Sequence, residues 1–430
     1  MNKRNQDRGE PNTNGISRRE AIKLGAAGAV AISFPSLTRA GGPGGVNNIG
    51  RQLIPFTIIN NSGSTEPAYL YLFGQLDPLN PKKNSAYLSS LDGDLTKFEI
   101  NDTAGKHYGL KLTGTTVDAF FPQLDGVRIY ISFGKKLFTT TDAEGFPGAI
   151  SADVPGANYK TLWDFSEFTW HNYGDHTILD GNVTQVDAFG LAFKVQFTGS
   201  DPADPQLSKT VINGFDVKTA RPDIFKELAK VGAPWSDLVI SDVGIPIRAL
   251  QPIKGIEAGF FPDDQLAGYI SEVLAYYNTA TSNRLIFGFE GVNYTGETTG
   301  KVFTFTPDKA KDVNGKPTHT YTAKFPETKF CYGNVNIATP DDAVGQEIGK
   351  ALLASLVRST LVFYPSFPVP QQDRSLYYVN PPVFEYSKII HKYGINNHAF
   401  CFGYDEYQGD AGPARSVRNP TTLTLTINGV

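Results

Sequence analysis

The alternation of apolar and polar residues predicts a strand, a loop and a second strand over residues 163–197. In residues 163–170 (WDFSEFTW) every second side chain falls on the same face, as in a strand. Residues 171–182 carry the Asn, Gly and Asp residues typical of a loop. Residues 183–197 are mostly apolar and predict a long return strand. We expect the rest of the chain to be arranged around this unit.

Further strands are predicted where short apolar runs alternate with clusters of Gly, Pro, Asn and Asp. We expect the last of these strands to complete a sheet that the first one begins. The runs are residues 56–60, 68–73, 97–100, 127–133, 285–289, 302–306, 400–403 and 421–427.

Helices are predicted where apolar residues recur at helical spacing. The first begins near residue 221, with Pro and Asp in its opening turn. The second opens on the acidic pair at 263–264, which suits the helix dipole. The third opens on Thr-Pro-Asp-Asp at 339–342, a cap followed by Pro and two acids. The fourth covers residues 383–393.

These elements predict a mainly β protein with a mixed α/β part, namely a β-barrel or sandwich domain interrupted by an inserted lobe. Residues 41–217 would form the first part of the barrel, with the strand–loop–strand unit. Residues 218–395 would form the lobe, and residues 396–430 would complete the barrel.

Residues 1–40 predict a signal peptide. Residues 17–23 (SRREAIK) form a twin-arginine pattern, an apolar run follows, and small residues near Ala40 offer a cleavage site. The run is too short for a permanent membrane span. We therefore expect export by the twin-arginine route, a mature chain without a membrane span, and a periplasmic or extracellular location.

Composition narrows the choice of partners. The 430 residues carry a net charge of −4, which argues against nucleic acid because phosphate binding needs basic surface. The six histidines show no metal-ligand spacing, and no nucleotide or cofactor motif occurs, so no metal or cofactor is predicted. Cys331 and Cys401 leave two possibilities open, a disulfide in an exported protein or two buried thiols.

Two carboxylates, Glu167 and Asp187, occur in strands that otherwise favour burial. An unpaired buried carboxylate costs several kcal/mol, roughly, so each needs a reason. Two carboxyls that flank one bond are the minimum for hydrolysing a glycosidic bond. The aromatic residues around Glu167 would favour its protonated form. The alternative is that either carboxylate faces solvent or forms a salt bridge, while Asp164, on the other face, anchors a turn or lies at the surface.

Several segments, taken in order, resemble glycoside hydrolase family 64, the laminaripentaose-producing type of endo-β-1,3-glucanase with a thaumatin-like barrel. The segments are RIYISFG (128–134), WDFSEFT (163–169), TQVDAFG (184–190), GIPIR (244–248), Tyr377 and Tyr378, Tyr386, His391, and FGYD (402–405).

The resemblance implies a barrel beside a mixed α/β lobe, with a wide groove between them for a β-1,3-glucan. It also implies inversion, with Glu167 as general acid and Asp187 as general base. It places substrate contacts at Thr169, Thr184 and Asn172, although Thr184 alternates to the opposite face from Asp187 and needs a bulge or twist to reach the ligand.

Three further residues are candidates. Trp170 and Tyr173 could stack on glucose rings, although a strand Trp is as often core. The resemblance to thaumatin-like folds, which have an acidic cleft, implies that Asp405 could line the same groove. The sequence thus predicts an exported, monomeric endo-β-1,3-glucanase. The alternative is a non-catalytic β-1,3-glucan-binding protein of thaumatin-like fold.

Overall fold

The computed structural model describes residues 51–76, 85–98, 108–139, 158–362, 369–371, 373–407 and 416–430. The predicted signal peptide lies outside these residues. Among the described residues, no helix is both long enough and apolar enough to cross a membrane.

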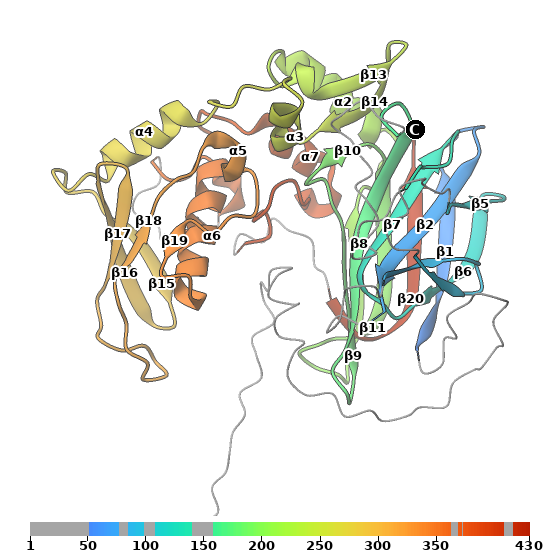
Figure 1. The fold of residues 1–430 in the computed structure, drawn as a ribbon, viewed down its shortest axis with the longest axis horizontal. Coiled ribbons are helices and arrows are strands. Elements are labelled where there is room, and N and C mark those ends of the chain that lie inside the picture. The colour runs from blue at the N-terminus through green and yellow to red at the C-terminus, as the bar shows by residue number, and fades with distance from the viewer. Residues whose placement is uncertain are drawn as a thin grey trace, which may run out of the picture.

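Most strands belong to one curled sheet of twelve (Figure 1). The mainly β character expected from the sequence is therefore confirmed. The twelve strands are β1 (Leu53–Asn61), β2 (Ala68–Gln75), β3 (Ser85–Leu88), β4 (Leu95–Lys97), β5 (Leu110–Leu112), β6 (Thr116–Pro122), β7 (Asp125–Phe133), β8 (Leu162–Asn172), β9 (Thr177–Val183), β11 (Ala192–Ser200), β12 (Ser208–Gly214) and β20 (Ser416–Asn428).

The C-terminal strand β20 joins this sheet to its beginning, as expected. It pairs in parallel with β1, with Phe56 opposite Leu423. It also pairs antiparallel with β11 and β9. The two ends of the described chain therefore meet in one sheet, although most of the helices lie between them in sequence.

The middle of the chain forms two smaller sheets with the helices around them, and in Figure 1 the five-stranded sheet lies well apart from the large sheet. The strands are β10 (Ala188–Phe189), β13 (Val239–Asp242) and β14 (Ile245–Leu250) in one sheet, and β15 (Leu285–Phe289), β16 (Val292–Thr299), β17 (Val302–Pro307), β18 (Tyr321–Ala323) and β19 (Ala338–Thr339) in the other. The helices are α2 (Ala220–Val231), α3 (Pro252–Glu257), α4 (Ala267–Tyr276), α5 (Thr328–Cys331), α6 (Ala343–Val357) and α7 (Glu385–Tyr393).

All four predicted helices exist as α2, α4, α6 and α7, with shifted starts. The helix expected from the acidic pair at 263–264 begins at Ala267. The cap of α6 is Asp342, whose carboxylate accepts the N–H of Gly345 at 2.9 Å, and not Thr339, which lies in β19. The strand expected at 400–403 is wrong, because these residues form bends and turns.

The central unit also differs from its prediction. His171 and Asn172 pair with Ile178 and Thr177, so the connection is a tight turn at 173–176 and not a loop over 171–182. The long return strand is wrong as well, since β9 ends at Val183 and the chain resumes in the large sheet only with β11. The residues between them leave the sheet, and Asp187 lies among them.

The central strands of the large sheet are buried on both faces. On the inner face, Phe121 stacks on Trp170 at a centroid distance of 6.1 Å and packs edge-on against Phe168. On the other face, Tyr130 of β7 stacks on Phe165 of β8 at 5.2 Å. Burying each such ring stabilises the fold by about 1.5–3 kcal/mol. The strands that carry the candidate site are therefore rigidly packed.

Candidate active site

Glu167 lies on β8 directly opposite Arg128 of β7. The Arg128 Nε donates to Glu167 Oε1 at 3.0 Å, and the Glu167 side chain is 17% exposed. A cation in contact with a carboxylate favours the charged form of that carboxylate. The expected apolar surroundings are wrong in part, because Phe168 and Trp170 project into the inner core. The salt bridge that the sequence left open as an alternative is present.

Arg128 is fixed from several sides. Its guanidinium carbon lies 5.2 Å from the centroid of the Phe165 ring, a distance typical of a cation–π contact. Burial lowers the pKa of Arg128, but Tyr130, Glu167 and Asp187 outweigh this effect and raise the pKa above its usual value. Arg128 is therefore charged at any pH at which the protein is folded.

Asp187 is half-buried and lies in the bend between β9 and β10. Its backbone carbonyl accepts the N–H of Gln251 at 3.0 Å. Its carboxylate acts electrostatically on both Arg128 and Tyr386. Glu167 therefore contacts Arg128 directly, whereas Asp187 influences Arg128 only through its charge.

The segment before Asp187 is held by Gln185. The backbone N–H of Gln185 donates to Phe400 O at 2.7 Å, and its carbonyl accepts the hydroxyl of Tyr386 at 2.8 Å. Gln185 itself is 1% exposed. The position of Asp187 therefore depends on α7 and on the residues after it, which are distant in sequence.

Asp164 holds the segment after Asp187. It is buried on the inner face, and its Oδ2 accepts the N–H groups of Gly190 at 2.7 Å and Leu191 at 2.9 Å. The turn-anchoring role considered from the sequence is confirmed, and the surface location is wrong. Burial raises the pKa of Asp164 to about 7, against the hydrogen bonds and the charge of Arg248 that lower it.

Three of the predicted substrate-binding residues are accessible in the structure. Thr169 is half-buried, and its hydroxyl accepts the N–H of Gly126 at 3.3 Å. Asn172 is exposed, and its side-chain oxygen accepts the N–H of Gly174 at 2.8 Å. Tyr173 is 53% exposed. These residues lie toward the turn that follows Glu167.

Three others are buried and cannot touch a sugar in this structure. Trp170 is 1% exposed, so the core alternative holds for it. Thr184 is completely buried, because the chain turns inward after β9. Asp405 is completely buried as well, and its Oδ2 accepts from His391 Nε2 at 2.8 Å and from the N–H of Cys401 at 2.9 Å.

The comparisons with known proteins agree on a family. The model of glycoside hydrolase family 64, described as "Beta-1,3-glucanase", matches residues 52–427. The chain belongs to glycoside hydrolase family 64. The resemblance predicted from the sequence is thereby confirmed, and the protein is a glycoside hydrolase.

Two relatives of the chain are named as glucan endo-1,3-beta-glucosidases. The chain is 27% identical over 398 residues to a glucan endo-1,3-beta-glucosidase of Cellulosimicrobium cellulans, with 87% of this chain and 67% of that protein covered. It is 27% identical over 395 residues to a glucan endo-1,3-beta-glucosidase of Arthrobacter sp. (strain YCWD3), with 87% and 66% covered. The chain thus spans about two thirds of the length of these relatives.

Two solved structures share the fold. One is a laminaripentaose-producing beta-1,3-glucanase in complex with laminaritetraose, with a TM-score of 0.72, 24% identity, and 88% of this chain and 99% of that chain covered. The other is a beta-1,3-glucanase domain from Clostridium beijerinckii, with a TM-score of 0.66, 20% identity, and 87% and 98% covered.

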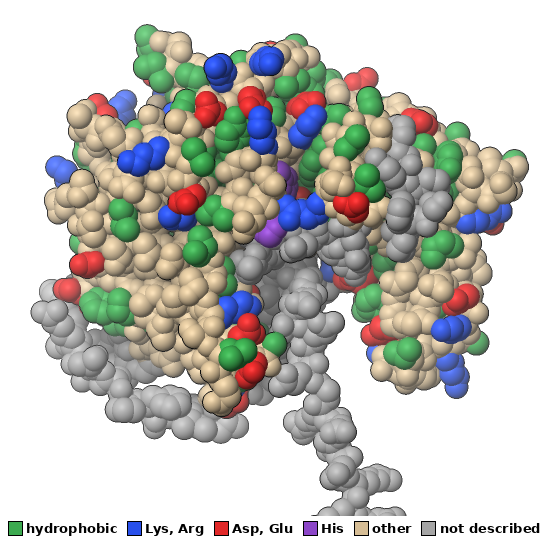
Figure 2. Space-filling view, turned by 180° about the vertical axis from the view of Figure 1, so that it is seen from behind, with side chains coloured by type: hydrophobic (Ala, Val, Ile, Leu, Met, Phe, Trp, Pro, Cys, Tyr) green, Lys and Arg blue, Asp and Glu red, His purple; other side chains and the backbone are tan. Residues whose placement is uncertain are grey.

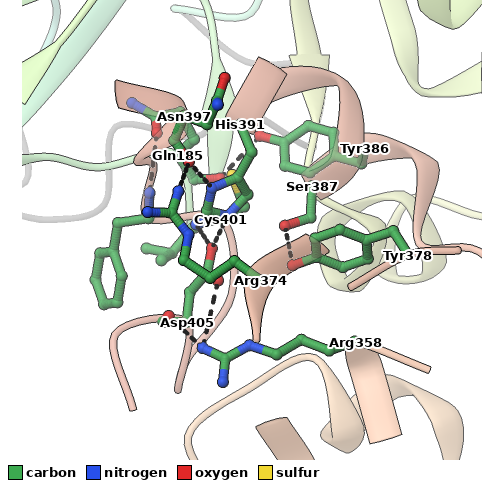
Figure 3. A network of polar contacts seen from close by, with 12 residues as sticks. Gln185, Arg358, Arg374, Tyr378, Tyr386, Ser387, His391, Asn397, Cys401 and Asp405 are labelled. Carbon is green, nitrogen blue, oxygen red and sulfur yellow. Dashed lines mark hydrogen bonds and ion pairs between the residues drawn. The ribbon is translucent and has the colours of Figure 1, made fainter. Parts of the chain in front are cut away.

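One buried cluster in this family 64 chain has atoms that could ligate a metal. The ligand atoms of His391, Cys401 and Asp405 lie within 4.8 Å of one another. However, the guanidinium of Arg358 approaches Asp405 at 3.9 Å and supplies positive charge from within the protein (Figure 3). Because His391 Nε2 already shares a hydrogen bond with Asp405, the cluster fits a hydrogen-bonded network better than a metal centre.

The two cysteines are free and buried. Burial raises the pKa of Cys331 to about 12, and it raises the pKa of Cys401 well above its usual value. Of the two possibilities left open by the sequence, the structure has the buried thiols.

The sequence reasoning missed Arg128, Tyr130 and Asn182. Arg128 and Asn182 lie opposite Glu167 in the sheet, on either side of it, and Tyr130 lies opposite Phe165. The side-chain oxygen of Asn182 is buried and has no hydrogen-bond partner among the described residues. A polar residue at every second position of the run VRIYISF was the signal that could have revealed Arg128.

Positive and negative side chains are mixed on the face of the molecule that Figure 2 shows. On the face shown in Figure 2, acidic and basic side chains of the described residues are interspersed, without a broad area of one sign. With the net charge of −4, such a surface suits a neutral polymer better than a polyanion.

Proposed function

We propose that this family 64 chain is an exported endo-β-1,3-glucanase that hydrolyses β-1,3-glucan with inversion at the anomeric carbon. The observation that carries the proposal is the family 64 match over residues 52–427, a range in which Glu167 and Asp187 are both partly exposed. The names of the two relatives support the substrate.

In this mechanism Glu167 acts as general acid and Asp187 as general base. Glu167 gives its proton to the glycosidic oxygen, while Asp187 takes a proton from the water that attacks the anomeric carbon from the other side. Inverting pairs are roughly 6.5–9.5 Å apart, which leaves room for that water. A bound sugar excludes solvent, and desolvation favours the protonated form of a carboxyl. Thr169, Asn172 and Tyr173 would contact the glucan.

The finer features of the fold and of export belong to the same proposal. The large sheet would be the thaumatin-like barrel, with residues 218–395 as the inserted lobe and a groove between them for the polymer. Residues 41–217 and 396–430 would supply the barrel. Residues 1–40 would be the twin-arginine signal peptide, and the exported protein would act as a monomer, in the periplasm or outside the cell.

A non-catalytic glucan-binding protein is the second candidate. One observation favours it: Glu167 forms an ion pair with Arg128, whereas a general acid must carry a proton. The two candidates differ in whether reducing ends are ever formed.

The test is the release of reducing sugar from a soluble β-1,3-glucan by the parent, Glu167→Gln and Asp187→Asn. We expect the parent to cleave and each variant to lose at least a few hundred-fold, since removing a general acid or base costs roughly 10²–10⁴-fold. Asp216→Asn is the control, because this carboxylate pairs with Lys194 and is 64% exposed. Binding without any cleavage by the parent would favour the second candidate.

A further inference from the structure

Arg128 faces Glu167 and lies within electrostatic reach of Asp187. It lies directly opposite Glu167 across the β7–β8 pairing, and opposite residues of an antiparallel pair share a face. Its Nε is 3.0 Å from Glu167 Oε1. Asp187 acts on the same guanidinium from the segment after β9.

The environment of Arg128 keeps it charged and in place. The Phe165 ring lies against the guanidinium at 5.2 Å, and Tyr130, next along the same face of β7, helps to raise the pKa of Arg128. The side chain is 35% exposed, so solvent or a ligand can reach it. An arginine so held acts as a fixed positive charge beside the carboxyls.

A fixed charge at this point affects both protons of the pair. An inverting site works while the acid carries a proton and the base does not. A nearby cation favours the ionised form of a carboxyl. It therefore moves the pH range in which the two carboxyls share one proton toward lower pH. The two carboxyls titrate as a pair, and the pH–rate profile reports that pair.

We propose that Arg128 is the positioning residue of the site: its ion pair orients the Glu167 carboxyl, and its charge sets the pH range in which the Glu167–Asp187 pair holds a single proton. This inference rests on the proposed catalytic roles of both carboxyls. Arg128 acts through the Glu167 carboxyl and contacts neither the sugar nor the attacking water in this scheme.

The other titratable groups that face the pair do not compete for this role. Tyr130 on β7 and Tyr386 on α7 are both buried, and burial raises the pKa of each above its usual value. Neither changes charge in the acidic and neutral range. Asp164 lies on the inner face and holds the backbone N–H groups of Gly190 and Leu191.

The experiment is the pH profile of kcat/KM on a soluble β-1,3-glucan for the parent, Arg128→Gln and Arg128→Lys. Arg128→Gln removes the charge, so we expect both limbs of the profile to move to higher pH by about one unit, the lower end of the 1–3 units typical of a close opposite charge. Arg128→Lys keeps the charge but loses the planar fork. It should leave both limbs in place and lower kcat about tenfold, because Glu167 is less well oriented.

The outcomes separate this inference from the proposed function. If the parent cleaves glucan but the limbs of a folded Arg128→Gln stay in place, Arg128 serves the fold only and the inference fails. If Arg128→Gln does not fold, the pH profile of Arg128→Lys decides. A shift of the limbs of that profile overturns the inference, and unchanged limbs with a lower kcat support it. If the parent cleaves nothing at any pH, the proposed function itself fails.

Discussion

Single carboxylates in this chain differ sharply in their surroundings. Glu167 contacts a cation at the edge of solvent, whereas Asp164, three residues earlier, is 3% exposed and accepts backbone N–H groups. Alternation along β8 separates them onto opposite faces. The sequence predicted that separation correctly, because the period of a strand is a local property.

Asp164 leads to a prediction about stability and pH. Its pKa is about 7 in the folded protein and roughly 3.9 in an unfolded chain. At pH values between these two pKa values, the Asp164 carboxyl is protonated in the folded state and ionised in the unfolded state. The free energy of unfolding therefore falls as the pH rises. The fall would be up to about 4 kcal/mol for this group.

The measurement is denaturant unfolding of the parent and Asp164→Asn at pH 5 and pH 8. Asparagine does not titrate, so the stability of the parent relative to the variant should be greater at pH 5 than at pH 8. Asp216→Asn, at an exposed ion pair, should show no such change. A parent-minus-variant difference that is equal at the two pH values would refute the assigned pKa.

At the scale of elements, the segment between β9 and β11 decides where the proposed base lies. It leaves the large sheet after Val183, and Gln185 bonds to Phe400, 215 residues away in sequence. No local pattern contains such a partner. For this reason the sequence predicted a continuous strand, and with it an accessible Thr184 that the structure buries.

Tyr386→Phe tests whether α7 positions this segment. The change removes the hydroxyl that donates to Gln185 O at 2.8 Å, a hydrogen bond that contributes about 1 kcal/mol. We expect kcat for glucan hydrolysis to fall several-fold with KM nearly unchanged, because the base shifts while the substrate contacts stay.

Tyr393→Phe is a matched control on the same helix, since its hydroxyl donates to Glu227 at 2.6 Å and not to the site. Both variants lose one hydroxyl from α7. Equal kcat values for the two would show that the bond to Gln185 does not position Asp187.

At the scale of the whole molecule, the site is built from segments that lie far apart in the sequence. Glu167 and Arg128 come from neighbouring strands, and Asp187 is held by Gln251 and, through Gln185, by Tyr386. The first strand, β1, is joined to the large sheet by β20, which pairs with it in parallel. The candidate site therefore depends on contacts between segments that are distant in the sequence.

Elements with strong periodicity, such as α6 and β7, could be predicted from the sequence, and so could the family. The partners of buried polar groups could not. Asp405 was expected to line the groove, yet it is completely buried and contacts Arg358 and His391 (Figure 3). Such enclosure arises from contacts between distant segments, which periodicity does not report.

The measurement that tests the central proposal most directly is the anomeric form of the first product. The protein is mixed with a soluble β-1,3-oligoglucan, and proton NMR records the new reducing ends before mutarotation equilibrates them. With Glu167 as acid and Asp187 activating water, the α-anomer should appear first and the β-anomer should follow slowly. A β-anomer that forms first would contradict the proposal, because it requires a covalent intermediate on one of the two carboxylates.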